Sequence, residues 1–197
     1  MTSTTALSAA QHALNQRLLS ERCMNEATIE QLYQDISAKF DNEGLSLQEA
    51  ISTSNQQLGL LGLEIVAVAM GGTRHFALTN KTVHDPVCKE SLHAMALTYG
   101  PREQALITAI LAHLVESTTA AKNTLINLRD TMELPEDVTT RPTLTEAQDI
   151  LDRLLLDKWL VVEGSCRLGP RTFCELPHFL AENLGMEAEN LPQRIYL

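Results

Sequence analysis

Apolar residues in the first sixty positions repeat at the three- and four-residue spacing of amphipathic helices. Two such patterns occupy the first forty residues, and a third begins at a capping box in which Ser46 and Glu49 can bond each other's backbone amides. Residues 63–70 and 74–79 then indicate two strands around Gly71-Gly72, a pair that tolerates positive φ. Three helices followed by a hairpin is the order of a winged helix.

The second half of the chain repeats this order. An apolar stripe at residues 101–115 predicts a helix, a shorter helix is expected at 118–128, and Thr143 and Glu146 form a second capping box. A second hairpin is expected at 159–168. The pattern predicts a mainly α fold with small antiparallel β wings, arranged as tandem winged-helix domains. A single α+β domain is the alternative, because short apolar runs are easily misassigned.

Two further helices complete this domain scheme. Residues 82–99 read as a connector helix, and residues 170–184 read as a terminal helix that Pro177 should kink or end within its first turn. We therefore place a first winged-helix domain with its connector helix at residues 1–98. A second winged-helix domain with the C-terminal helix is placed at residues 99–197.

Charge narrows the classes of partner. The 197 residues include 15 Lys and Arg against 25 Asp and Glu, a net charge of -10. Residues 1–100 hold 6 basic and 10 acidic side chains and residues 101–197 hold 9 and 15, so the halves carry -4 and -6. Neither half has the basic surplus needed to coat nucleic acid or anionic lipid. The sequence also has no apolar run of roughly 18 residues, so we expect an intracellular protein with no membrane partner.

No pattern of an active site or metal site is present. Cys174 with His178, and His84 with Cys88, each supply two ligands where a tetrahedral zinc site needs four. Gly71-Gly72 is followed by no G-K-[ST] sequence, and no G-x-S-x-G motif marks a nucleophile. We expect no catalytic, cofactor-binding or metal-binding residue in this chain.

The third helix of each unit has few or none of the cations that contact DNA. Residues 46–58 contain no Lys or Arg, although Asn55, Gln56 and Gln57 could bond to bases, and residues 144–157 carry a net charge of -3. In the wings, Arg74, Arg167 and Arg171 are candidates for weak DNA contact. So few phosphate contacts predict a weak, salt-sensitive affinity.

Leucine and other apolar residues cluster at the two junctions between the third helix and the first wing strand, and this favours binding to another protein. The candidates for partner binding are Leu60, Leu61 and Leu63 in the first half, and Leu155 and Trp159 in the second. Aromatic anchors are enriched at interfaces, although a lone Trp more often belongs to a core. We therefore favour protein-interaction platforms over DNA readers.

Two stretches resemble a known family. LTEAQDILDRLLLDKWLVVEGSCRLGPRTFCELPHFL at residues 144–180 closely resembles the second winged helix of the non-SMC element one subunit of the SMC five/six chromosome complex. LGLEIVAVAMGGTRHFALTN at residues 60–80 looks like the first wing of that family. The resemblance covers most of the chain, but Pro177 departs from it within the last helix.

The resemblance implies a scaffold subunit that binds a MAGE-type tandem winged-helix protein and a kleisin. Members of the family act in DNA repair, recombination and chromosome maintenance in the nucleus, where a C-terminal zinc-binding RING works with the MAGE partner as a ubiquitin ligase. Such a RING would be expected to begin close to Leu197, so we expect neither zinc nor ligase activity of residues 1–197 themselves. A DNA-binding paired winged-helix regulator or a bacterial kleisin-associated protein is the alternative, and a small-molecule enzyme ranks third.

Overall fold

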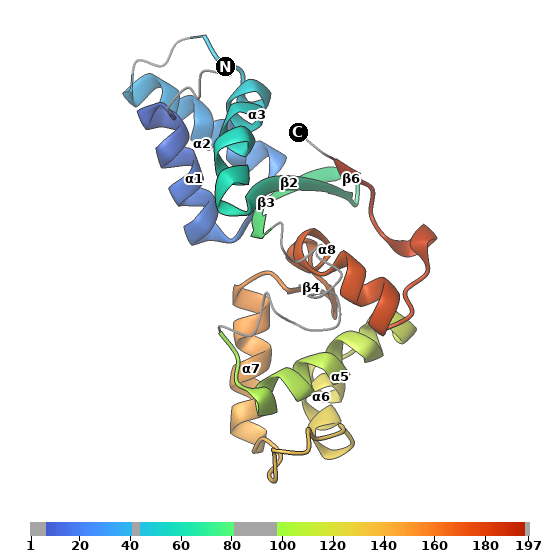
Figure 1. The fold of residues 1–197 in the computed structure, drawn as a ribbon. Helices are drawn as coiled ribbons and strands as arrows, with labels where there is room; N and C mark the ends of the chain where they lie inside the picture. The colour runs from blue at the N-terminus through green and yellow to red at the C-terminus, as the bar shows by residue number, and fades with distance from the viewer. Residues whose placement is uncertain (1–6, 41–43, 81–97, 196–197) are drawn as a thin grey trace. The chain divides into compact units, whose positions relative to one another are not determined.

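Two units make up the chain, and the computed structural model describes residues 7–40, 44–80 and 98–195 of it (Figure 1). The first unit comprises Met1–Thr82 with Pro192–Leu197, and the second comprises Val83–Leu191. The C-terminal residues 192–197 thus belong to the first unit, and the domain boundary expected after residue 98 stays a prediction. The predicted connector helix at residues 82–99 falls mainly outside the described residues.

The first unit places three helices on one side of an antiparallel sheet (Figure 1). Its elements are α1 (Ala9–Glu21), β1 (Cys23–Asn25), α2 (Glu26–Lys39), α3 (Leu47–Leu58), the 3₁₀ turn η1 (Gly59–Leu61), β2 (Leu63–Met70), β3 (Thr73–Asn80) and β6 (Arg194–Ile195). The strands lie in the order β1-β3-β2-β6. The helices and the hairpin of β2 and β3 agree with the elements that the sequence predicts.

Side chains at helical spacing fill the core of this unit. Leu14 and Leu18 of α1, Ile29 of α2 and Ile51 of α3 are fully buried and pack with Ile65 of β2. The predicted capping box of α3 is confirmed, since the Glu49 backbone N–H donates to Ser46 Oγ while the Ser46 N–H donates to the Glu49 carboxylate. The start of α3 is therefore set by the hydrogen bonds between Ser46 and Glu49, which the sequence predicts.

The second unit repeats three helices and a hairpin and then adds short turns. Its elements are α5 (Pro101–Ser117), α6 (Lys122–Asn127), the 3₁₀ turn η3 (Leu128–Asp130), α7 (Leu144–Leu156), β4 (Leu160–Glu163), β5 (Ser165–Leu168), α8 (Pro170–Glu175), the π-helical turn η4 (Phe179–Asn183) and the 3₁₀ turn η5 (Ala188–Asn190). Leu106, Ile110 and Leu154 are buried in its core with Trp159.

A shared backbone feature relates the two units beyond the order of their elements. In each, the first helix ends at a residue with positive φ, Arg22 at 66° and Thr118 at 61°. The next residues then pair with the second wing strand, β1 with β3 in the first unit and Ala120 with Cys166 of β5 in the second. This short first strand is part of a winged helix, so the fold class of tandem winged helices with small β wings is confirmed.

Two expectations from the sequence differ from the structure. The sequence pattern predicts two helices in the first forty residues and no strand between them, because the three residues of β1 show no strand periodicity. The single helix expected at 170–184 is wrong: α8 ends at Glu175, and a separate π-helical turn begins at Phe179. Pro177 and His178 are helical and lead directly into this turn, so Pro177 starts a second helical segment and has no N–H to bond back to α8. In the described part of the chain, the helices are too short or too polar to cross a bilayer.

We predict that Gly169→Ala destabilises the protein by about 1–3 kcal/mol, the usual cost of overpacking. An added Cβ would contact the backbone carbonyl of Lys158 and would lie 2.9 Å from the backbone of Trp159, and neither backbone can move as a side chain would. Urea unfolding followed by circular dichroism measures the loss.

The matched control is Gly100→Ala, whose Cβ would have the Glu103 carboxylate at 3.9 Å as its nearest neighbour. This variant should cost less than about 1 kcal/mol, the difference expected at a helix N-cap. Equal losses in the two variants would contradict the steric explanation.

Candidate functional site

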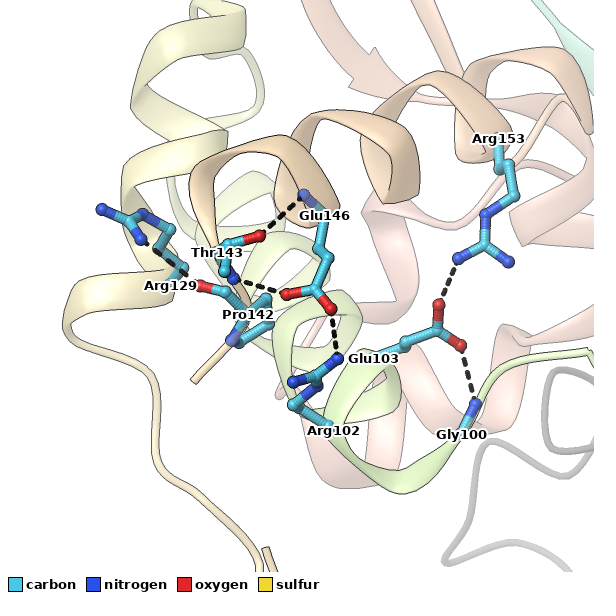
Figure 2. A network of polar contacts seen from close by, with 8 residues as sticks. All are labelled: Gly100, Arg102, Glu103, Arg129, Pro142, Thr143, Glu146 and Arg153. Atoms are coloured by element: carbon cyan, nitrogen blue, oxygen red, sulfur yellow. Dashed lines mark hydrogen bonds and ion pairs between the residues drawn. The ribbon is translucent and has the colours of Figure 1, made fainter. Parts of the chain in front are cut away.

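The start of α7, the third helix of the second unit, is fixed by Glu146, whose carboxylate accepts hydrogen bonds from two groups (Figure 2). Glu146 accepts the Thr143 N–H at 2.7 Å, and its own N–H donates to Thr143 Oγ1 at 3.3 Å. The same carboxylate accepts Arg102 of α5 at 2.5 Å. Just before this helix start, Arg129 donates to the Pro142 carbonyl at 3.3 Å.

A second carboxylate connects the same two helices near the far end of α7 (Figure 2). Glu103 of α5 accepts the Gly100 N–H at 2.8 Å and forms an ion pair with Arg153 of α7. The Arg153 guanidinium also lies 4.7 Å from the centroid of the Tyr99 ring. Since Arg153 is the only Lys or Arg within Leu144–Leu156, the one cation of this helix is already used to hold α5.

These contacts set the protonation of the network. Backbone and side-chain hydrogen bonds from Thr143, with Arg102 beside it, lower the pKa of Glu146 below its ordinary value of 4.5. Burial raises the pKa of Tyr99 to about 12, so its phenol stays neutral. The network is a structural clamp between two helices, and the charged side chains that α7 exposes to solvent are Asp149 and Asp152.

In the third helix of the first unit, Asn55, a candidate for hydrogen bonds to DNA bases, is bonded to the protein itself. Asn55 of α3 donates to the Ile65 carbonyl at 2.9 Å and accepts the Ile65 N–H at 2.6 Å. Its amide is thus bound to the backbone of β2. Of the three amide side chains that the sequence offers for base contact, this one lies against the wing of its own unit.

The three wing arginines expected to contact DNA form ion pairs within the protein. Arg74 pairs with Glu26 of α2, and that hydrogen bond raises the already high pKa of the guanidinium. Arg167 pairs with Glu163 across the second wing at 2.5 Å. Both keep about 40% of the side chain exposed, so they remain candidates for weak contact with phosphate.

Arg171 differs from the other two because its side chain is only 10% exposed. Its Nε donates to Glu175 at 2.6 Å, and its guanidinium lies 4.1 Å from the centroid of the Trp159 ring. A further ion pair at 3.7 Å reaches Asp157. This placement argues against a DNA contact, because reaching phosphate would require Arg171 to leave a packed and paired position.

The apolar candidates separate into exposed and buried residues. Leu60 and Leu61 of η1 are 75% and 74% exposed and line a hollow of about 300 Å³, which is completed by Leu7, His12, Gln57 and Leu58. Leu63 and Leu155 are partly buried against the cores of their units. Trp159 is 1% exposed, so it packs in the core of its unit, which argues against its role as a partner-binding residue.

The binding candidates chosen from the sequence in this half of the chain are Leu155 and Trp159, whereas Leu156 is the most exposed large apolar side chain of α7. The available signal was its position, because residues 149, 152 and 156 share one helix face and the first two are aspartates. Within the described residues, no three His, Cys, Asp or Glu side chains gather as metal ligands. Cys174 is buried, and the pair of His84 and Cys88 lies outside those residues.

Comparison with known proteins identifies the family. The model of a family described as "Nse1 non-SMC component of SMC5-6 complex" matches residues 11–176. The chain belongs to this family. The Nse1 resemblance carried by residues 60–80 and 144–180 is thereby confirmed, and the chain is a non-SMC component of the SMC5-6 complex by its family.

A solved structure shares the fold of this Nse1 family member. A chain of the structure described as "Nse1-Nse3-Nse4 complex" superposes with a TM-score of 0.72 at 20% sequence identity. The match covers 91% of this chain and 76% of that chain. No curated protein sequence matches this chain.

We predict that Glu146→Gln weakens the dependence of stability on pH in the acid range. Because the folded-state pKa of Glu146 is lowered below 4.5, its contribution is present above that value and is lost as the pH falls through the folded pKa. Urea unfolding at pH 7 and pH 3 should therefore show a smaller loss of stability in the variant than in the wild type.

The control for this prediction is Asp149→Asn, which removes a carboxylate from the exposed face of the same helix. Its pH dependence should follow the wild type more closely than that of Glu146→Gln. The same reduction in both variants would mean that total charge, and not the clamp at Thr143 and Arg102, causes the effect.

Proposed function

We propose that this Nse1 family member is a protein-interaction scaffold subunit that binds a MAGE-type tandem winged-helix protein and a kleisin. The exposed pair of Leu60 and Leu61 is the observation that carries the proposal. The complex that contains the structural neighbour is described by three subunit names, Nse1, Nse3 and Nse4, which supports an assembly of this kind.

The surface around these leucines suits an apolar partner. The 3₁₀ turn η1 lies between α3 and β2, and the Gly62 N–H closes it on the Gly59 carbonyl at 3.2 Å. The two leucines are therefore held outward on short, hydrogen-bonded backbone. Nearby α3 contains no Lys or Arg and a single Glu at its far end, so few charges must lose water when a partner covers the hollow.

The partner-mediated route also agrees with the distribution of charge. The cation of α7 is held by Glu103, and the helix exposes aspartates that phosphate would repel. An acidic subunit can act on chromosomes if more basic neighbours contact the DNA. We accordingly propose a nuclear role in DNA repair and recombination in which this chain contacts DNA weakly or through partners.

Ubiquitin ligase activity in this proposal depends on a zinc-binding RING and not on the winged helices. The four cysteines of the chain form no C-x-x-C pair. We assign these residues the role of the ligase body, which positions the MAGE partner, and we assign them no step of ubiquitin transfer.

We predict that the double variant Leu60→Asp/Leu61→Asp weakens binding to the MAGE-type partner from the same genome. Two charges in an apolar contact should cost about 2 kcal/mol or more, roughly thirtyfold in Kd. Isothermal titration calorimetry with the purified partner measures the change.

Leu19→Asp is the matched control, because Leu19 is an exposed leucine of α1 that does not line the hollow. Its affinity should equal that of the wild type. Loss of binding in both variants, or in neither, would exclude the hollow as the contact site.

The alternative of a DNA-binding regulator makes the opposite prediction for the free protein. We expect the chain to bind a 20-base-pair duplex with a Kd weaker than about 10 µM at about 0.15 M salt, the range of non-specific binding. Fluorescence anisotropy measures it. Sub-micromolar binding that Arg74→Ala and Arg167→Ala weaken would instead support direct DNA recognition.

A further inference from the structure

The C-terminal strand β6 adds to the sheet of the first unit at the outer edge of β2 (Figure 1). Ile195 lies opposite Ala67 and Arg194 lies opposite Val68 in an antiparallel register. Beyond this pair, the Ala69 N–H donates to the Gln193 carbonyl at 3.1 Å. A segment more than 120 residues distant in sequence therefore completes the edge.

The backbone alternation of β2 shows which groups β6 satisfies. Because Ala69 donates toward β6, Ala67 and Ile65 also direct their N–H and C=O groups to this edge, whereas Val66 and Val68 direct theirs to β3. At Ile65, the next residue that faces this edge, the Asn55 amide bonds both the N–H and the carbonyl. The edge is thus closed by a fixed side chain at one position and by β6 at the next two.

The side chains of β6 fix its position on both faces of the sheet. Ile195 packs against the hydrophobic core of the first unit. Arg194 pairs with Glu64 of β2 at 2.7 Å, and each of these two side chains is only 13% exposed. Arg194 therefore matches the acidic Glu64 on one face of the sheet, and the adjacent Ile195 matches the apolar core on the other face.

We propose that the outer edge of β2 at Ala67–Ala69 is an acceptor site for an extended strand with adjacent basic and apolar residues, and that β6 is the chain's own occupant that keeps it closed. Sheet edges accept strands from other polypeptides through backbone hydrogen bonds, and alternate side chains give the specificity. The occupant that replaces β6 is a partner segment of this chemistry, selected by Glu64.

The few backbone hydrogen bonds that hold β6 allow a partner strand to replace it. Among the described residues, which end at Ile195, the pairing of β6 with β2 comprises two residue pairs and one further backbone hydrogen bond. Each hydrogen bond contributes only about 1 kcal/mol net, so a longer partner strand can compete with it. This inference does not depend on the proposed function, since the hollow at Leu60 and Leu61 lies on other elements.

The test uses the full chain with Ile195→Pro, because proline removes the N–H that pairs with Ala67. Hydrogen exchange followed by NMR should become at least tenfold faster at the amides of Ala67 and Ala69. The amides of Val66 and Val68 are internal controls and should keep their rates, because they bond to β3.

A peptide with the sequence of residues 191–197 is the probe for the opened edge. At about 1 mM, the scale of effective concentration that a short tether provides, it should slow exchange at Ala67 and Ala69 in the variant again and leave the wild type unchanged. The same peptide with Arg194→Glu should fail, and Glu64→Arg in the Ile195→Pro protein should restore its action.

Four results would overturn the proposal. Unchanged exchange at Ala67 and Ala69 in Ile195→Pro would mean that β6 does not close the edge, and equal acceleration at Val66 and Val68 would make β6 part of the domain fold. Failure of the wild-type peptide would mean that the edge accepts no strand in trans. Protection that rises with protein concentration, without peptide, would make a second copy of the chain the occupant.

Discussion

Much of this structure depends on one interaction, the carboxylate or amide that reaches back from the third position of a helix to the N–H of its cap residue. The helices α1, α3, α5 and α7 begin in this way, whereas α2 begins at Asn25, whose side chain accepts the Thr28 N–H. The interaction satisfies donors that a helix start leaves open, and it favours negative charge at the positive end of the helix dipole. It also fixes where the third helix of each winged unit begins.

In the second unit the same acidic residues take up the cations. Glu103 and Glu146 each bond a helix start and an arginine of the facing helix, so α5 and α7 are joined by two ion pairs of opposite direction. Arg171 is similarly used inside the unit, over the Trp159 ring. The winged-helix shape is therefore retained while the groups that would contact phosphate are bound within the protein, which favours a subunit that engages proteins.

The two candidate interaction regions of the first unit differ in their chemistry. The hollow at Leu60 and Leu61 is open and apolar, so any partner that covers it gains from the burial of leucine side chains. The edge of β2 is closed by Asn55 and β6 and offers backbone hydrogen bonds with one acidic position. One region depends on shape and apolar area, and the other depends on register.

The sequence alone determined the features that depend on interactions between residues close together in the chain. Capping residues and three- and four-residue spacing located the helices, Gly71-Gly72 located the first hairpin, and Pro177 located a helix end. Family resemblance followed from residues 60–80 and 144–180, which set the fold. Leu60 and Leu61 could be named as candidates because an apolar pair beside glycines is visible in the chain.

Only the tertiary structure decided matters that depend on contacts distant in sequence. It buried Trp159 and Arg171, because exposure depends on which elements cover a side chain and not on residue type. It directed Asn55 to β2, and it formed β1 and β6, strands of three and two residues whose pairing partners are elsewhere in the chain. Such short segments have no periodicity of their own, so their conformation is set by the edge against which they lie.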